Sequence, residues 1–379
     1  MNYYIIAGEA SGDLHASNLI NQLKVLDKHA DFRCWGGDLM EQQGAHLVKH
    51  YRDLAFMGFT EVLMNIRTIL QNIQFCKKDI LNYQPDVLIL IDYPGFNLRI
   101  AEFAKSKNIR VFYYISPQVW AWKQSRVHKI KRVVDKMFVI LPFEKDFYKK
   151  FEYPVDFVGH PLLDAVAGYE AQAKDVINTD KPIIALLPGS RKQEIDTMLP
   201  LMLTMQKYYS GYQFVIAGAP SQSEKLYQLY IDAFQKQYPD VPPIEIVFNK
   251  TYQLLKQATA ALVTSGTATL ETALFGVPEV VCYKGGAISF AIAKKLVKVD
   301  YISLVNLIME KEIVKELIQN DLNEGNLKAE LDKLLTGNSR KEMMSNYEDL
   351  KQRLGGAGAS KKTAELMISY LTTNKKSST

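Results

Sequence analysis

Short apolar runs alternate with amphipathic stretches along the first half of the chain. The apolar runs contain few polar residues, which is typical of strands buried on both faces of a parallel sheet. They lie at 3–7, 32–35, 87–92, 110–115, 137–141 and 155–158. Between them, apolar residues recur at helical spacing and predict helices at 12–28, 38–44, 61–82, 97–107, 119–133 and 143–150. This alternation predicts a parallel sheet covered by helices on both faces.

A second alternating series begins near residue 180. It starts with a strand and a loop in KPIIALLPGS and continues with further apolar runs, the first of which precedes a helix-forming pattern at 222–237. These runs predict strands at 213–219, 244–248, 260–265 and 278–283, of which we expect 278–283 to be the last. Two such series in tandem predict an α/β protein with two Rossmann-like domains, at 1–168 and 169–349.

Five loops that follow predicted strands carry small or polar residues. They are AGEASGD (7–13), IDYPGFN (91–97), ISPQVWAW (115–122), LPGSRKQE (187–194) and TSGTATLE (264–271). In open parallel sheets, ligands bind beyond the carboxyl ends of the strands, so these loops are the candidates for a site. Neither LPGSRKQE nor TSGTATLE matches GxxxxGK[ST] or GxGxxG, which argues against a P-loop and a nicotinamide cofactor.

The loop LPGSRKQE has the residues of an anion site. Gly189 and Ser190 allow main-chain N–H groups to approach an anion at the start of a helix. Arg191 can bind phosphate oxygens with two parallel hydrogen bonds. Glu194 fits a capping role near the helix start. An ordinary turn with a surface arginine is the alternative interpretation.

The loop TSGTATLE has small and hydroxyl residues where the next helix is expected to begin. Ser265, Gly266 and Thr267 suit a diphosphate at a helix N-terminus. Glu271, one turn further on, could accept hydrogen bonds from both hydroxyls of a ribose. A helix cap with an acidic first turn is the alternative. With LPGSRKQE in the same half of the chain, a nucleotide site is favoured.

The loops of the first half suggest acid–base chemistry. Asp92 ends a buried strand, where a carboxylate is costly unless it is used or hydrogen-bonded, and it could act as a general base. A cap on the turn that leads into the helix at Asn97 is the alternative. In AGEASGD, Ser11 and Gly12 could bind an anion through main-chain N–H groups, while Glu9 or Asp13 orients a sugar hydroxyl. Alternatively, Ser11 caps the following helix.

The composition is that of a globular protein, with 47% apolar and 23% charged residues in a chain of 379. No segment approaches the roughly 18 consecutive apolar residues of a membrane-spanning helix. The N-terminus lacks the basic region of a signal peptide, so we expect a cytoplasmic protein. Three widely spaced cysteines and six histidines without ligand spacing predict neither a disulfide framework nor a metal site.

Two further regions suggest contact with a lipid surface. The net charge is +5, and nine of the lysines and arginines lie between Lys123 and Lys150 with only three acids, which suits phosphates, anionic lipid or nucleic acid. The stretch 56–75 holds more large apolar residues than one buried helix face needs. A solvated helix face and ordinary core are the respective alternatives. The residues expected to contact acyl chains or membrane are Phe56, Met57, Phe59, Leu63, Ile66, Trp120 and Trp122.

An ordered series of motifs over almost the whole chain resembles one family, the lipid-A-disaccharide synthases. The series includes GEASGD (8–13), FMGFTEVL (56–63), PDVLILIDYPGFN (85–97), YYISPQVWAWKQSRVHKIKR (113–132), VGHPLLDA (158–165), ALLPGSRKQEI (185–195), TSGTATLETALFGVPEVVCY (264–283) and KKLVKVDYISLVNLI (294–308). The resemblance implies a GT-B fold, with two Rossmann-like domains facing a cleft. It also implies a C-terminal helix, at about 350–372, that returns to the first domain.

The resemblance also implies a reaction in the biosynthesis of lipid A, the anchor of lipopolysaccharide. An inverting glycosyltransferase would move 2,3-diacylglucosamine from its UDP derivative to the 6-hydroxyl of 2,3-diacylglucosamine 1-phosphate (lipid X). The products would be the disaccharide 1-phosphate and UDP. No cofactor is implied, because the UDP-sugar is a substrate, and no metal is expected.

The family's residue roles can be placed on this sequence. The catalytic base falls on Asp92, and Asn306 matches a polar position near the nucleotide. Many members have a second acid three residues after the base, where this chain has Gly95, and Tyr93 replaces a small residue. The acylated substrates imply a peripheral protein on the anionic inner face of the cytoplasmic membrane. A homodimer is compatible with the sequence, and no nucleic acid is expected.

Two other functions remain as alternatives. Another UDP-sugar transferase of the GT-B fold, or a UDP-sugar epimerase, would share the two-domain plan. An epimerase would need a second acid–base group and no acceptor. A non-enzymatic basic scaffold that binds membrane or nucleic acid would explain the basic region. That function would leave Asp92, Arg191 and Glu271 without a role.

Overall fold

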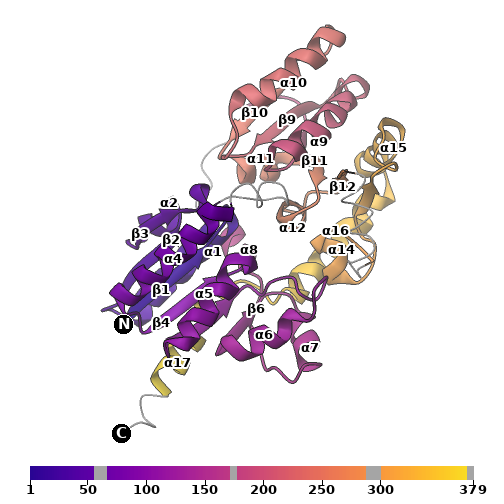
Figure 1. The fold of residues 1–379 in the computed structure, drawn as a ribbon. Coiled ribbons are helices and arrows are strands. Elements are labelled where there is room, and N and C mark those ends of the chain that lie inside the picture. The colour runs from indigo at the N-terminus through magenta and orange to yellow at the C-terminus, as the bar shows by residue number, and fades with distance from the viewer. Residues whose placement is uncertain (55–65, 171–176, 287–299, 374–379) are drawn as a thin grey trace. The chain divides into compact units, whose positions relative to one another are not determined.

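The computed structural model describes residues 1–54, 66–170, 177–286 and 300–373, and it divides into two compact units (Figure 1). Unit 1 comprises Met1–Asp164 and the C-terminal segment from Leu354 onward, and unit 2 comprises Ala165–Arg353. The boundaries expected from sequence, after residue 168 and near residue 350, fall inside helices α8 (Leu162–Glu170) and α16 (Asn338–Arg353).

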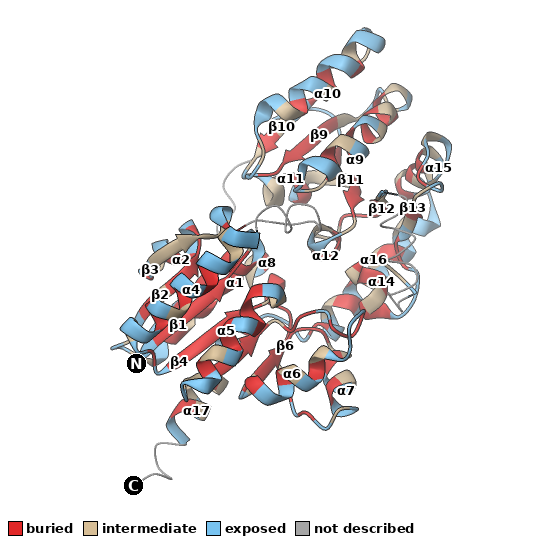
Figure 2. Ribbon diagram, in the orientation of Figure 1, coloured by how far each residue is buried: buried red, intermediate tan, exposed pale blue. Residues whose placement is uncertain are grey.

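Seven parallel strands form the sheet of unit 1, in the order β3-β2-β1-β4-β5-β6-β7. They are β1 (Asn2–Ala7), β2 (Asp31–Gly36), β3 (His46–His50), β4 (Val87–Ile91), β5 (Arg110–Tyr114), β6 (Lys136–Val139) and β7 (Asp156–Phe157). The central strand β4, with the sequence VLILI, is buried along its whole length (Figure 2). Strand β3 was missed, because its sequence HLVKH is largely polar and it lies at the sheet edge.

The helices of unit 1 pack on the sheet through their apolar sides. They are α1 (Ala10–Leu26), α2 (Asp38–Gln42), α4 (Ile66–Tyr83), α5 (Pro94–Ser106), α6 (Arg126–Val133), α7 (Glu144–Lys149) and α17 (Ala359–Thr373), with a short 3₁₀ helix η1 (Tyr51–Asp53). Helix α6 begins at Arg126 and not at residue 119 as predicted, since the SPQVWAW segment forms turns.

The C-terminal helix α17 packs against α1 within unit 1. Its first turn is capped by Asp164, whose carboxylate accepts hydrogen bonds from the N–H groups of Gly358 and Ser360. At the other end of α17, the Tyr370 hydroxyl donates to Asp156. The return of the C-terminal helix to the first unit, expected from the family resemblance, is therefore seen in the structure.

Six parallel strands form the sheet of unit 2, in the order β10-β9-β8-β11-β12-β13. They are β8 (Ile183–Leu187), β9 (Gln213–Gly218), β10 (Glu245–Phe248), β11 (Ala258–Thr264), β12 (Glu279–Tyr283) and β13 (Lys315–Ile318). The prediction that 278–283 is the last strand is wrong. Strand β13, with the sequence KELI, pairs with β12 at the sheet edge, where polar side chains are tolerated.

The helices of unit 2 alternate with these strands and follow them. They are α9 (Lys192–Thr204), α10 (Glu224–Gln237), α11 (Thr251–Gln257), α12 (Thr267–Leu274), α14 (Leu304–Met309), α15 (Glu324–Leu335) and α16, with a 3₁₀ helix η2 (Met205–Tyr208). Within the described parts of the chain, no helix combines the length and apolar character needed to cross a membrane. The three cysteines are buried and free.

Candidate functional site

The candidate loops gather at the carboxyl edge of the sheet in each unit. In unit 1, Ala7 at the end of β1 pairs with Ile91 at the end of β4, and Ile91 pairs with Tyr114 at the end of β5. This register brings AGEASGD, IDYPGFN and ISPQVWAW to one edge. In unit 2, Leu187 at the end of β8 pairs with Val263 of β11, which places LPGSRKQE beside TSGTATLE.

Asp92 lies in a strained turn directly after β4. Both Asp92 and Tyr93 adopt left-handed backbone conformations, with φ of 43° and 48°, which costs free energy for residues other than glycine. Two buried side chains hold the turn. The Asn97 amide donates to the main-chain carbonyl of Asp92 at 2.7 Å, and the Tyr113 hydroxyl donates to the same oxygen. The main chain of Asp92 is thus fixed from two sides.

The environment of Asp92 suits a general base near neutral pH. Burial is the main cause that raises the pKa of the Asp92 carboxyl, and the negative charge of Glu9 adds to it, to about 7. A hydrogen bond from the Tyr93 N–H acts in the opposite direction. A base of this pKa is about half ionised at pH 7, is largely ionised at pH 8, and still has affinity for a proton. The Asn97 side chain ties this turn together through the carbonyls of Ile91 and Asp92.

The loop AGEASGD contains both structural and available polar groups. Helix α1 begins at Ala10, so Ser11 lies inside the helix and is exposed, and the expectation that Ser11 caps the helix is wrong. The first helical hydrogen bond runs from the Asp13 N–H to the Glu9 carbonyl. The N–H groups of Ser11 and Gly12 therefore precede the helical ladder, where an anion could be bound.

Asp13 in the same loop has a structural role. Its buried carboxylate accepts hydrogen bonds from the N–H groups of Gly37, Leu39 and Met40 at 2.8, 3.1 and 3.1 Å, which caps helix α2. A Cβ atom on Gly37 would lie 2.6 Å from this carboxylate, so only glycine allows the approach. Asp13 is therefore occupied by the fold, and Glu9 remains the acidic candidate in this loop.

In LPGSRKQE, the anion-binding groups are already occupied by an acid of the chain itself. The Glu194 carboxylate accepts hydrogen bonds from the N–H groups of Ser190 and Arg191 at 3.1 and 3.2 Å, and its other oxygen pairs with the Arg191 guanidinium at 2.9 Å. The capping role expected for Glu194 is thus confirmed. The same contacts mean that a phosphate would compete with Glu194 for these donors.

In TSGTATLE, helix α12 begins at Thr267 after the N-cap residue Gly266, and both of these residues are exposed. The Ser265 hydroxyl donates to the carbonyl of Ile302 at 3.1 Å. Glu271 is half-buried, and its carboxylate accepts a hydrogen bond from the Tyr252 hydroxyl at 2.9 Å. Burial raises the pKa of Glu271, while the Tyr252 hydrogen bond lowers it. One oxygen of Glu271 is thus held in place.

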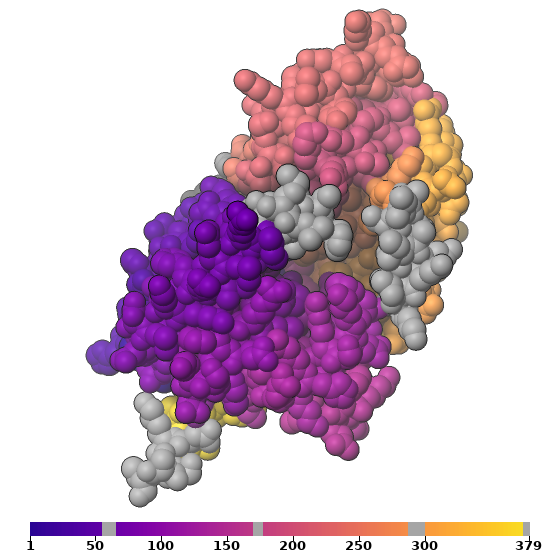
Figure 3. Space-filling model, viewed as in Figure 1, coloured from indigo at the N-terminus to yellow at the C-terminus, as the bar shows by residue number. Residues whose placement is uncertain are grey.

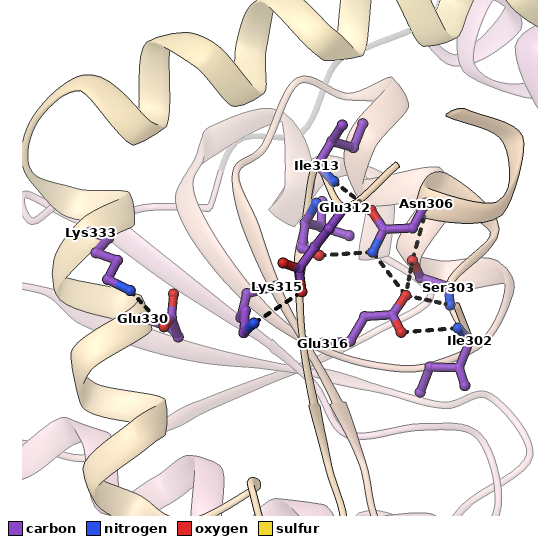
Figure 4. Close-up of polar contacts among 10 residues, drawn as sticks. Ile302, Ser303, Asn306, Glu312, Ile313, Lys315, Glu316, Glu330 and Lys333 are labelled. Carbon is purple, nitrogen blue, oxygen red and sulfur yellow. Dashed lines mark hydrogen bonds and ion pairs between the residues drawn. The ribbon is translucent and has the colours of Figure 1, made fainter. Parts of the chain in front are cut away.

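Asn306 does not have free groups for a nucleotide. Its side-chain oxygen accepts from the N–H groups of Ile313 and Val314, and its side-chain nitrogen donates to the Val314 carbonyl and to Glu316 (Figure 4). An amide offers two acceptor and two donor positions, and all are used. The expectation that Asn306 contacts the nucleotide is therefore corrected, because this fully buried residue organises its own unit.

The residues expected to meet lipid differ in their exposure. Phe56, Met57, Phe59 and Leu63 lie outside the described residues. Trp120 is 9% exposed and packs against the Phe143 ring at 4.9 Å, so it is a core residue and not a surface contact. Ile66 and Trp122 are each 41% exposed.

Trp122 lies within a basic surface of unit 1. The Lys123 ammonium and the Arg126 guanidinium lie 4.6 and 5.4 Å from the centre of its ring. Helices α6 and α7 carry further lysines and arginines, and their part of the chain contributes to the face of the molecule seen in Figure 3 (magenta atoms). On the same surface, Glu102 neutralises part of the charge through ion pairs with Lys129 and Arg132.

Several residues that shape these loops were missed from sequence. Asn97, Tyr113 and Tyr252 were assigned no role in holding the candidate acids, and Glu316 was not considered. Tyr113 and Tyr252 looked like ordinary apolar positions of a strand and a helix. The signal that could have found them is the position of Asp92 and Glu271, because a half-buried carboxylate or strained turn requires donors nearby.

Comparison with known sequences identifies one family. A family model described as lipid-A-disaccharide synthetase matches residues 3–368. The lipid-A-disaccharide synthase of Trichlorobacter lovleyi is 37% identical over 376 residues, and that of Syntrophus aciditrophicus is 40% identical over 376 residues. Each alignment covers 97% of this chain and 97% of the relative.

Solved structures of lower sequence identity share the fold. A UDP-GlcNAc 2-epimerase from Neisseria meningitidis bound to UDP-GlcNAc matches with a TM-score of 0.67 at 15% identity, covering 97% of this chain and 100% of that one. The glycosyltransferase of kitacinnamycin matches with a TM-score of 0.66 at 13% identity, covering 98% and 99%. Together with the two parallel sheets, these similarities confirm the predicted GT-B fold. The chain therefore belongs to the lipid-A-disaccharide synthase family, glycosyltransferases of lipid A biosynthesis.

Proposed function

We propose that this protein transfers 2,3-diacylglucosamine from UDP-2,3-diacylglucosamine to the 6-hydroxyl of 2,3-diacylglucosamine 1-phosphate, with Asp92 as the general base. The observation that carries this proposal is the fixed turn at Asp92, with a carboxyl pKa raised to about 7. In this step Asp92 accepts the proton of the acceptor hydroxyl as its oxygen attacks the anomeric carbon. The bond to the UDP oxygen breaks, and the configuration at the anomeric carbon inverts.

Unit 2 supplies the binding groups for UDP in this proposal. Arg191 is 57% exposed, so its guanidinium can turn to the diphosphate and offset the negative charge that grows on the leaving group. The start of helix α12, at Gly266 and Thr267, offers main-chain N–H groups to the same anion. Glu271 accepts from the ribose hydroxyls with the oxygen that Tyr252 does not hold. These charges and dipoles act without a resident metal or cofactor.

Unit 1 supplies the acceptor side. Ser11 and Gly12 offer main-chain N–H groups, and Glu9 both orients a sugar hydroxyl and raises the pKa of Asp92. Gly95, where the family resemblance implies a second acid, has open space around its Cβ position. The base in this chain therefore acts without a carboxylate at that position.

The direct test is release of UDP from UDP-2,3-diacylglucosamine with and without the monosaccharide 1-phosphate. Release that requires the acceptor, together with formation of the disaccharide 1-phosphate, supports the transferase. The solved epimerase with the same fold makes sugar epimerisation the second candidate. Conversion of the UDP-sugar in the absence of acceptor would favour that activity and contradict our proposal.

A peripheral position on the inner face of the cytoplasmic membrane extends this proposal. Trp122 with Lys123 and Arg126 offers an aromatic ring beside two cations, which suits the interface of an anionic bilayer. On α4, Ile66 and Leu70 lie one helical turn apart and are 41% and 50% exposed. Sedimentation with anionic vesicles at low and high salt tests this position. A Trp122→Ala variant that sediments as well as wild type would contradict the contact, and sedimentation velocity would show whether the protein is a homodimer.

A further inference from the structure

A closed hydrogen-bond network in unit 2 surrounds the carboxylate of Glu316 on β13 (Figure 4). One oxygen accepts from the Ile302 N–H at 3.0 Å. The other accepts from the N–H and the hydroxyl of Ser303 at 3.0 and 2.8 Å, and from the Asn306 amide at 2.9 Å. Three of these four donors converge on one oxygen of the carboxylate, and the fourth reaches the other oxygen.

Asn306 and Ser303 anchor this network in the core of the unit. Both residues are fully buried. The Asn306 amide holds the main chain at Ile313 and Val314, directly before β13, and the Ser303 hydroxyl also accepts from the Asn306 N–H as the cap of α14. Because each member has its partners, the network fixes the turn at residues 302–303 relative to β13.

The network reaches the candidate nucleotide site through a single peptide group. In the peptide that joins Ile302 to Ser303, the N–H donates to Glu316 and the carbonyl accepts from the Ser265 hydroxyl at 3.1 Å. A hydrogen bond from an N–H to a carboxylate is stronger than a neutral one and polarises the peptide, which makes its carbonyl a better acceptor. Glu316 therefore strengthens the bond that holds Ser265.

This bond also determines what Ser265 can offer to a ligand. A hydroxyl has one proton to donate, and that of Ser265 is committed to the Ile302 carbonyl. The Ser265 main-chain N–H is likewise used, because it donates to the Cys282 carbonyl. The groups left on Ser265 are oxygen lone pairs, which accept from an O–H or N–H and cannot donate to a phosphate oxygen.

We infer that Glu316 is a positioning residue of the nucleotide site, which holds the Ser265 hydroxyl as a hydrogen-bond acceptor for the uridine part of UDP. The inference rests on the proposed binding of UDP to unit 2. It replaces the expectation that Ser265 binds the diphosphate. The donor on the ligand is a ribose hydroxyl or the uracil N–H, since both belong to uridine.

The test is a double-mutant cycle on UDP binding, measured by calorimetry with Glu316→Gln, Ser265→Ala and the double variant. In Glu316→Gln, the side-chain nitrogen is itself a donor and faces other N–H donors, so hydrogen bonds of the network are lost. Each single variant should weaken UDP binding by roughly three- to tenfold, the size of one hydrogen bond. The double variant should bind UDP no more weakly than the single variant with the lower affinity, because Glu316 acts through Ser265.

Glu312→Gln is the matched control. It removes a neighbouring carboxylate that forms an exposed ion pair with Lys315 (Figure 4), and UDP binding should stay at the wild-type value. If Glu316→Gln does not fold, the cycle is run with Glu316→Asp, which keeps the charge and draws it back from Ile302 and Ser303. Additive effects of the two sites on UDP binding would overturn the inference.

A second experiment tests whether the Ser265 hydroxyl contacts the uridine part or the diphosphate part of UDP. Ser265→Ala should weaken binding of uridine, measured by displacement of UDP, by the same factor as binding of UDP itself. A loss seen for UDP and absent for uridine would place the hydroxyl on the diphosphate and overturn the inference. A wild-type protein that binds no UDP would contradict the proposed function itself, whereas UDP binding with additive variants would contradict this inference alone.

Discussion

The hydroxyl of Tyr113 on β5 donates a hydrogen bond to the main-chain carbonyl of Asp92, the residue that follows β4. Both strands are central and parallel, and Tyr113 pairs with Leu90, two residues before Asp92. The bond holds Asp92 in a left-handed conformation that its backbone would otherwise leave. The Tyr113 hydroxyl takes no part in proton transfer in our proposal, but it determines where the candidate base Asp92 points.

Tyr113→Phe should lower kcat without weakening UDP binding. Loss of the hydroxyl lets the strained turn relax, and a small displacement of a base can reduce the rate by one to two orders of magnitude, that is roughly 10- to 100-fold. The measurement is kcat from steady-state kinetics beside the Kd of UDP. Tyr153→Phe is the matched control, since this buried tyrosine also donates to a main-chain carbonyl, that of Val134, away from the turn. Equal losses of kcat in both variants would contradict a role specific to Asp92.

The pH dependence of the reaction should report the ionisation of Asp92. Only the ionised carboxylate can accept a proton, so kcat/KM should rise with pH and level off above about 7, the pKa of Asp92 in the free protein. Asp92→Asn should abolish turnover and leave UDP binding intact. A profile that is flat from pH 5 to 9 would remove Asp92 as the base.

Glu9→Gln should move the acidic limb of this profile to lower pH. Removing the Glu9 charge lowers the pKa of Asp92, because repulsion from Glu9 is the second cause of its rise after burial. Burial remains in the variant, so the shift should be partial. An acidic limb at the wild-type position would show that the Glu9 charge does not act on the base, whatever the change in KM.

The arrangement of the central strands could be predicted from sequence because their apolar runs are uninterrupted. Strands such as VLILI and IIALL are buried on both faces and leave no other interpretation. The edge strands β3 and β13 were not predicted from sequence. HLVKH and KELI lie at sheet edges and are only partly buried, so polar residues are tolerated there and interrupt the apolar pattern.

The candidate site was only partly predictable, because the sequence does not show which polar groups the fold itself uses. Asp13 and Asn306 both looked available for a ligand. In the structure they hold helix α2 and the segment before β13 respectively. The prediction that Trp120 contacts lipid was wrong for a related reason, because an aromatic residue in a loop can still pack into the core. Which hydrogen bonds close internally depends on contacts between distant segments.

Glu194→Gln should strengthen UDP binding while lowering stability slightly. The Glu194 carboxylate competes with a phosphate for the N–H groups of Ser190 and Arg191 and for the Arg191 guanidinium. A neutral amide oxygen can still cap the helix, at a cost of about 1 kcal/mol or less. Calorimetry with UDP at low salt is the measurement, and we expect roughly a threefold lower Kd.

The control for Glu194 is Asp196→Asn on the same helix. Asp196 pairs with Lys192 across one turn and accepts a hydrogen bond from the Tyr230 hydroxyl. Its loss should leave the Kd of UDP unchanged, while the melting temperature shows any general effect on α9. Weaker UDP binding in Glu194→Gln would mean that the capped conformation is the one that binds the diphosphate.

We expect the buried carboxyl of Glu279 to lower the free energy of unfolding of unit 2 as the pH rises. This residue begins β12, is fully buried, and neither carboxylate oxygen has a well-formed hydrogen bond. Burial raises its pKa well above the ordinary value of 4.5, and the Tyr347 hydroxyl offsets only part of this effect. Between the unfolded and folded pKa values the folded state holds a proton that the unfolded state has lost. The free energy of unfolding therefore falls by about 1.4 kcal/mol per pH unit through that range.

Glu279→Gln removes this titration, and its stability should change less steeply than that of wild type above pH 4.5. The measurement is urea unfolding from pH 4 to 8, with the difference between the two proteins plotted against pH. Glu312→Gln, at an exposed acid, should follow the wild-type curve throughout. Parallel curves for wild type and Glu279→Gln would show that Glu279 has the same pKa folded and unfolded, which a buried carboxyl without firm partners cannot have.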